Sequence, residues 1–177
     1  MKSPKTFFIG DTHIGHRKII EFSPERKFNT IEEHDEAIIT AWNLVVTPID
    51  KVFHLGDVFF RKENIEQAKR LNGRKFLIMG NHDTYWSATE YEKVFERCYG
   101  GFAFNDCILT HVPVHPNQLD HRFKFNIHGH LHSHNLQDSR YINVSAEQLP
   151  NLAPVSWEYL KENFMKNTKE ARDEKEG

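Results

Sequence analysis

The sequence predicts an α/β fold, and two features of the chain point to this class. In the first half, short apolar runs typical of buried strands alternate with helical patterns, whereas the second half is mostly strand-like. The length of 177 residues fits one domain with a substantial hydrophobic core. We therefore expect helices layered on sheets, at least one of them mixed.

Four apolar runs are the first strand candidates. Each is rich in Phe, Val, Ile or Leu and is short enough for a buried strand. They are TFFI (6–9), KVFHL (51–55), KFLIM (75–79) and CILT (107–110). Because the chain contains 14 phenylalanines, we expect aromatic packing in the core.

Helical patterns separate the first three strands. The first helix is predicted to start at Thr30, with Glu33 completing a capping box, and to continue through residues 32–45. The other two patterns also carry end signals. They cover 63–73, with Gly73 as a C-cap, and a segment from Ser87, with Glu90 three residues on, to about Arg97.

The second half of the chain continues with shorter strands. The segment GGFAFNDCILTH (100–111) predicts two strands around an Asn-Asp turn. Further strands are expected near 123–128 and 141–145. Residues 154–165 are typical of a closing helix, or of a strand leading into one.

One domain is expected over residues 1–165, because the chain shows no internal repeat and no linker-like segment. Residues 166–177 are highly charged and lack apolar periodicity, which predicts a flexible tail.

Composition excludes several classes of function. The net charge of −2 gives no basic excess, so we expect no nucleic-acid surface. The first apolar run is too short for a signal peptide, and no run is long enough to span a bilayer. Cys98 and Cys107 form no CxxC pair and are interpreted as reduced thiols. These features predict a soluble cytoplasmic protein with no membrane partner.

Histidine is the unusual component, with 12 copies. The segment NIHGHLHSH (126–134) places imidazoles at every second position, namely His128, His130, His132 and His134. On one face of an extended strand these rings would crowd each other. The segment alone is compatible with a solvated loop, a His-rich low-complexity tract or a metal site.

Polar side chains able to bind metals follow five of the predicted strands, and in four cases a glycine comes directly before them. Ligands in α/β proteins collect at the carboxyl ends of strands, and glycine there permits sharp turns and close approach. Five such strand ends favour a shared metal site over five unrelated helix caps. The residues are Asp11 and His13, then Asp57, then Asn81, His82 and Asp83, then His111, and finally His130 and His132.

The order of these motifs resembles one family. GDTH, GDV, GNHD, THVP and GHLH occur in sequence between residues 10 and 132. With them, the chain resembles the calcineurin-like metallophosphoesterases. LNGRKFLIMGNHD and VFHLGDV are similar to the small single-domain bacterial and bacteriophage members. The resemblance implies a four-layer α/β/β/α sandwich, with two mixed sheets flanked by helices.

The resemblance also implies a centre with two metal ions. One ion would be held by Asp11, His13, Asp57 and His132, and the other by Asp57, Asn81, His111 and His130. Asp57 would bridge the two, since a carboxylate offers two anionic oxygens. Nitrogen and oxygen ligands without thiolate suit Mn²⁺, Fe²⁺, Zn²⁺, Co²⁺ or Ni²⁺, and we expect Mn²⁺.

The expected activity is hydrolysis of small phosphodiesters, nucleotides among them, by in-line attack of a metal-bridging hydroxide. His82, oriented by Asp83, would protonate the leaving group. The alternatives are a phosphomonoesterase, including a protein phosphatase, and a non-catalytic binding scaffold. The filled ligand positions argue against the scaffold.

Four further residues are candidate substrate contacts. His16 lies close to the first ligands in sequence, with a helix-entry role as its alternative. Arg17 and Arg61 can pair with a phosphate, but we favour a solvated surface position for each. For His128 we favour a packing role over substrate contact. His54 is predicted to be a core histidine.

Overall fold

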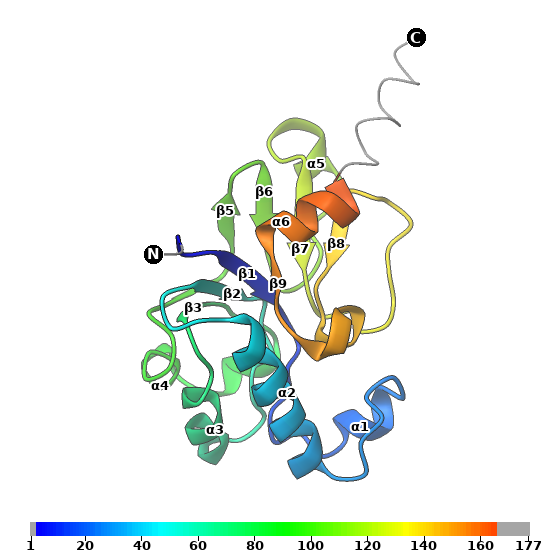
Figure 1. The fold of residues 1–177 in the computed structure, drawn as a ribbon. Helices are drawn as coiled ribbons and strands as arrows, with labels where there is room; N and C mark the ends of the chain where they lie inside the picture. Colours follow the sequence, from blue (N-terminus) through cyan, green and yellow to red (C-terminus); the bar gives the residue numbers. More distant parts are fainter. Residues whose placement is uncertain (1–2, 166–177) are drawn as a thin grey trace.

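Two β-sheets pack face to face in a computed structural model that describes residues 3–165 (Figure 1). Within these residues the first sheet has five strands in the order β4-β3-β2-β1-β9. β1 to β4 run parallel, and β9 pairs antiparallel with β1. The strands are β1 (Thr6–Ile9), β2 (Lys51–His54), β3 (Arg74–Ile78), β4 (Arg97–Tyr99) and β9 (Val155–Ser156).

The second sheet has four strands over the same described range, in the order β5-β6-β7-β8. β5 and β6 form an antiparallel hairpin around Asn105, whereas β6, β7 and β8 are parallel. The strands are β5 (Phe102–Phe104), β6 (Cys107–Leu109), β7 (Phe125–His128) and β8 (Tyr141–Asn143). Both sheets are mixed, as predicted.

Phenylalanine fills the space between the sheets. Phe8, Phe53 and Phe76 are register partners on β1, β2 and β3, and therefore form a row across one face. The rings of Phe102 and Phe104 on β5 meet this row, at centroid distances of 5.2 Å and 5.6 Å from Phe53. The predicted aromatic core is confirmed.

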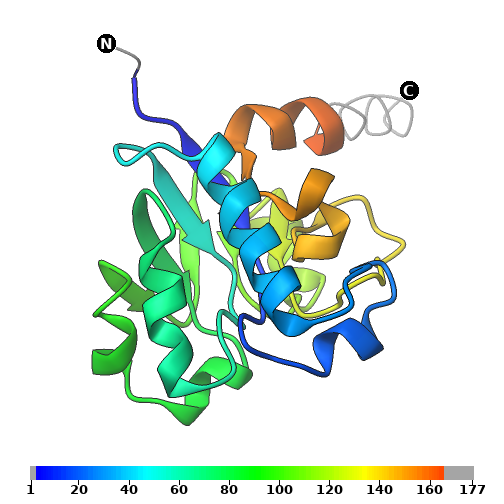
Figure 2. The same cartoon turned by 60° about the horizontal axis from the view of Figure 1, so that its bottom comes forward.

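Helix α2 (Ile31–Val45) covers the outer face of the first sheet and lies across its strands in Figure 2. Its Trp42 stacks on His54 of β2, with centroids 6.2 Å apart. The Thr30 side chain accepts a hydrogen bond from the Glu33 N–H, so the predicted helix start is confirmed. His54 is fully buried and bonds the Thr12 hydroxyl through Nε2, which confirms its core position.

The remaining helices are short and lie in the connections between strands. They are α1 (Ile19–Phe22), α3 (Ile65–Lys69), α4 (Ala88–Tyr91), α5 (Asn117–His121) and α6 (Trp157–Leu160). α5 occupies the crossover from β6 to β7, and β9 leads directly into α6, as one of the two predicted alternatives has it. Two mixed sheets with flanking helices are thus confirmed.

Two local predictions were wrong, and two helices were missed. The second helix ends at Lys69, so Gly73 is not its C-cap but a turn residue at φ +92° before β3. The third helix ends at Tyr91, because the segment that follows turns to pair β4 with β3. The sequence pattern also missed α1 and α5.

The two sheets are joined at the carboxyl end of β1. Gly10 donates from its N–H to the Val144 carbonyl and accepts from the Ala146 N–H, just after β8. This places the loops that follow β1, β2 and β3 beside those that follow β6 and β7. In residues 3–165 we find no helix with the length and apolar character needed to cross a membrane. The predicted tail, 166–177, lies outside the described residues.

Candidate metal centre

The seven predicted ligands converge where the carboxyl ends of both sheets meet. Asp57 lies in the middle of the group. Its Oδ2 is 3.7 Å from His13 Nε2 and 3.5 Å from His111 Nε2. Two overlapping sets, Asp11-His13-His132 and Asp11-Asp57-His111, each have ligand atoms within 4.8 Å of one another.

Asn81 completes the second half of the centre. Its Oδ1 lies 2.9 Å from His111 Nε2 and 3.0 Å from His130 Nδ1, and these two nitrogens are 3.2 Å apart. The three atoms come from the ends of β3, β6 and β7. Their mutual distances of 2.9–3.2 Å are compatible with a single cation bound to all three atoms.

Backbone strain is concentrated at the ligands. A positive φ is uncommon outside glycine and costs about 1–3 kcal/mol for each residue. Five of the seven predicted ligands adopt it, at φ values from 50° to 69°: Asp11, His13, Asp57, His130 and His132. Such strain persists only where the surrounding structure enforces it, and its clustering here marks a functional site.

Two glycines leave the space that the carboxylates fill. A Cβ on Gly80 would lie 2.2 Å from Asp57 Oδ1, and one on Gly129 would lie 2.4 Å from Asp11 Oδ2. Neither glycine has a positive φ. Close approach of a ligand, and not a left-handed turn, therefore explains the glycine before Asn81 and the one before His130.

The hydrogen bonds around the ligands fix which lone pairs are free. His111 Nδ1 donates to the Leu55 carbonyl at 2.7 Å, so Nε2 presents a lone pair to Asn81 Oδ1 and Asp57 Oδ2. Asp11 Oδ2 accepts from two donors, whereas the buried Asp11 Oδ1 and His13 Nε2 have no hydrogen-bond partner. Lone pairs that face each other repel, and a cation between them removes the repulsion. The donor set therefore fits divalent ions.

Burial changes the ionisation of the Asp11 carboxyl. Burial raises the pKa of this carboxyl to about 6, although the neighbouring His111 and His132 rings lower it. A divalent ion would hold Asp11 ionised at neutral pH.

Comparison with known proteins agrees with this geometry. The profile of the calcineurin-like phosphoesterases matches residues 4–175. The chain belongs to this family. It is therefore a metal-dependent phosphoesterase, a hydrolase of phosphoric esters, and the family uses a centre of two metal ions.

Two relatives match most of the phosphoesterase chain. An uncharacterised protein of Methanocaldococcus jannaschii is 34% identical over 176 residues, covering 90% of this chain and 91% of the relative. The Gene 66 protein of Mycobacterium phage L5 is 32% identical over 162 residues, covering 72% and 77%. A protein of unknown function from Aquifex aeolicus has the same fold, with a TM-score of 0.73 at 24% identity, covering 90% of this chain and 99% of that chain.

A buried ion pair, Arg26 with Glu147, lies behind the phosphoesterase centre and was not predicted from the sequence. Glu147 Oε1 accepts from His132 Nδ1 at 2.7 Å, and Glu147 Oε2 accepts from Arg26 Nη2 at 2.7 Å. Arg26 also donates to the carbonyls of Asp11 and Thr12. Although burial by itself would raise the pKa of Glu147, the bonds from His132 and Arg26 lower it to about 2. Glu147 thus holds His132 with its Nδ1 protonated, and Arg26 holds the backbone at Asp11.

Nothing in the sequence connects these two residues. Arg26 lies in a loop after α1, and Glu147 follows β8, 121 positions later. Neither belongs to a motif with ligand spacing. A carboxylate behind a ligating histidine is the general expectation for metal sites, but sequence alone does not say which carboxylate.

The Asp83 carboxylate does not bond to the His82 ring, contrary to the prediction. The carboxylate accepts from the N–H groups of Asp57, Val58 and Gly80, at 2.7, 3.1 and 2.8 Å. His82 Nδ1 has no hydrogen-bond partner. The expectation that Asp83 orients the His82 ring is therefore wrong. Asp83 instead holds the loop that carries the bridging ligand.

The phosphoesterase centre opens into a hollow of about 550 Å³. Its lining comes from the loops after β1, β2, β3 and β7 and from α1: His13, His16, Ile19, Phe22, Ser23, Phe60, His82, His130, Leu131, His132, Ser133 and His134. His16 and His82 reach this hollow, so both can meet a substrate. The His16 ring is 5.3 Å from that of His13.

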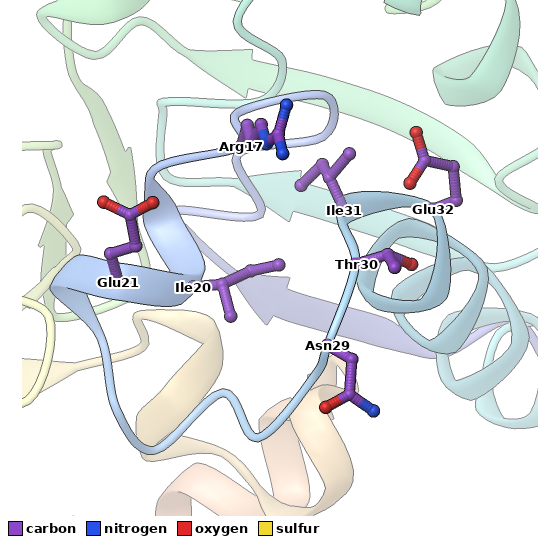
Figure 3. Close-up of a pocket in the computed structure, with 7 residues that line it drawn as sticks. All are labelled: Arg17, Ile20, Glu21, Asn29, Thr30, Ile31 and Glu32. Carbon is purple, nitrogen blue, oxygen red and sulfur yellow. The ribbon is translucent and has the colours of Figure 1, made fainter.

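The other predicted substrate contacts lie elsewhere. Arg17 lines a separate hollow between α1 and the start of α2, together with Glu21 and Glu32 (Figure 3). Arg61 is exposed and faces Glu63 at 3.8 Å. His128 is fully buried and donates from Nδ1 to the Gly129 carbonyl. A buried ring offers no surface to a substrate, which leaves the packing role for His128.

Proposed function

We propose that this phosphoesterase is a phosphodiesterase that acts on small diesters and depends on two divalent ions, Mn²⁺ in the first instance. The lining of the hollow carries this proposal: among its residues, all in the described part of the chain, there is no lysine or arginine. A phosphomonoester carries close to two negative charges at neutral pH, and sites for such dianions commonly add cationic side chains. A diester carries one negative charge and needs fewer cationic side chains.

The residues that would hold the two ions are those implied by the motifs. Asp57 would bridge, since its Oδ2 faces imidazole nitrogens on both sides. When bound, the ions lower the pKa of water and neutralise charge on the phosphoryl oxygens. Imidazole and carboxylate ligands without thiolate are compatible with Mn²⁺.

The surroundings of His82 support its proposed role at the leaving group. Its backbone N–H donates to Asp57 Oδ1 at 2.9 Å, which ties its position to the bridging ligand. Its Nε2 is 3.8 Å from Asp57 Oδ2, and about a third of its side chain is exposed to the hollow. A protonated His82 would donate its proton to the leaving oxygen, so that an alcohol departs.

A small substrate also fits the surroundings. The hollow carries no row of cations that would follow a nucleic-acid backbone. Cys98 and Cys107 are both free thiols, which is typical of a reducing compartment, so we propose the cytoplasm as the location.

Hydrolysis of bis(p-nitrophenyl) phosphate beside p-nitrophenyl phosphate, each with Mn²⁺, tests the proposal. We expect the diester to be the better substrate. His82→Ala should lower its turnover by about 10²–10⁴-fold while the metal content stays at the wild-type value. The exposed His115, outside the hollow, gives the matched control His115→Ala, which should keep full activity.

Two results would contradict the proposal. Preference for the monoester would identify a phosphomonoesterase. Turnover of neither ester by protein that holds both ions would favour a binding role.

A further inference from the structure

Two aromatic side chains are exposed beside the centre. Phe22 and Phe60 line the hollow, and their exposed fractions are 67% and 37%. Water contact with so much apolar surface is unfavourable for a folded chain. Large apolar groups kept exposed inside a hollow are typical of a surface that a ligand covers.

The position of Phe60 is fixed before any ligand arrives. Phe59 pairs with Ile14 in a β-bridge, and the Phe60 N–H donates to the Ile14 carbonyl at 3.0 Å. The Phe60 ring stacks on His16, with centroids 4.0 Å apart and planes 7° apart. A rigid ring loses little conformational entropy when a second flat group stacks on it.

This aromatic surface begins at the reacting centre. The Phe60 ring is 5.7 Å from that of His82, and the Phe22 ring is 6.4 Å from that of His16. A phosphate ester held by the ions would therefore carry one of its organic groups against Phe22 and Phe60. No lysine or arginine is among the described residues that line the hollow, so an uncharged organic group suits this position better than a second phosphate.

We propose that Phe60 and Phe22 form an aromatic platform for the base of a nucleoside phosphodiester. The base would stack on the Phe60 ring, which is parallel to His16, and pack against the edge formed by Phe22, whose plane is inclined by 67° to that of His16. The platform makes nucleotide diesters the substrate class of this site. The inference rests on the proposed function, because it assigns the substrate of the same centre. Stacking tolerates every base, so the platform selects for a base and does not distinguish one base from another.

Calorimetric titration of the Mn²⁺-loaded protein with two ligands tests the platform. Adenosine 5′-methylphosphonate and methyl methylphosphonate share a monoanionic head group, and only the first carries a base. We expect the adenosine ligand to bind at least about tenfold more tightly, equivalent to about 1.4 kcal/mol. Phe22→Leu and Phe60→Leu should each remove most of this preference, whereas Phe22→Tyr, which keeps the ring, should retain it.

Tyr85 supplies the matched control. It is 72% exposed and its ring is 6.4 Å from that of His82, but it does not line the hollow. Tyr85→Leu should therefore preserve both the preference and the hydrolysis of the aryl diester.

The outcomes separate this inference from the proposed function. Equal binding of the two ligands, or a preference unchanged in both leucine variants, would overturn the platform, even if the aryl diester is hydrolysed. A preference lost in the leucine variants, with no hydrolysis of the aryl diester, would support the platform and overturn the phosphodiesterase proposal.

Discussion

Replacing Gly80 with alanine should weaken metal binding although no metal ligand is substituted. The new Cβ would lie 2.2 Å from Asp57 Oδ1 and 2.7 Å from Asp57 N. Real Cβ contacts are essentially never closer than 3.0 Å, so the carboxylate oxygen would have to move to at least that distance. The backbone nitrogen cannot rotate away, and the whole Asp57 loop would have to shift with it.

The size of this shift sets the expected effect. Metal sites tolerate deviations of about 0.2 Å in ligand distance, and the displacement of Asp57 Oδ1 exceeds this several-fold. Because Asp57 is the proposed bridge, both ions should bind at least about tenfold more weakly. Overpacking of this kind should also lower the free energy of unfolding by about 1–3 kcal/mol.

Titration of metal-free protein with Mn²⁺, together with urea unfolding, measures both effects. Gly100 is the matched control, because a Cβ there meets nothing within 4 Å. Gly100→Ala should keep wild-type metal affinity and gain up to about 1 kcal/mol from reduced freedom of the unfolded chain. Gly80→Ala with wild-type metal affinity would refute the reasoning, because it would show that Asp57 has room to move.

The other predictions concern the groups behind the ligands. Glu147→Gln should cost about 3 kcal/mol of unfolding free energy in metal-free protein, since it leaves the buried Arg26 without an anion. Because the folded-state pKa of Glu147 is lowered from 4.5 to about 2, its stabilisation is present above pH 4.5 and lost as the pH falls towards 2. Urea unfolding between pH 6 and pH 3 should therefore show a difference between wild type and Glu147→Gln that shrinks on acidification, and a constant difference would contradict the assignment. Asp83→Asn should lower the free energy of unfolding by about 1–3 kcal/mol and weaken metal binding, because at least one of the three backbone N–H groups then faces the amide NH₂ and loses its acceptor. An unchanged unfolding midpoint in urea would show that these bonds contribute little.

The sequence by itself predicted most of the strands and the candidate ligands. The strands Thr6–Ile9, Lys51–His54 and Arg74–Ile78 form within one residue of the predicted runs 6–9, 51–55 and 75–79, because a fully buried strand needs apolar residues on both faces. Ligands that follow parallel strands of one sheet lie near each other, since the carboxyl ends of such strands lie at one edge. The start of α2 at the Thr30 cap was also predictable from the sequence, because a cap is a local interaction.

Long-range pairing decided what the local patterns left open. β4 forms at residues 97–99 because β3 offers a free edge there, although the preceding residues suggested a continuing helix. The bond between Arg26 and Glu147 spans 121 positions, and no spacing rule connects them. Asp83 lies beside His82 in the chain but bonds the loop of Asp57, because successive residues of the 3₁₀ helix His82–Tyr85 point in different directions.

The four alternating histidines show most directly what the sequence determines and what the tertiary structure determines. In a continuous strand they would share one face, but β7 ends at His128, and His130 and His132 adopt φ values of 69° and 51°. These left-handed residues redirect the chain, so His128 is buried while His130 and His132 face the centre and His134 lies exposed at the hollow. The sequence determined which side chains can bind a metal. Only the tertiary structure decided which of them reach it, because the packing of two sheets supplies the free energy that holds a strained backbone in place.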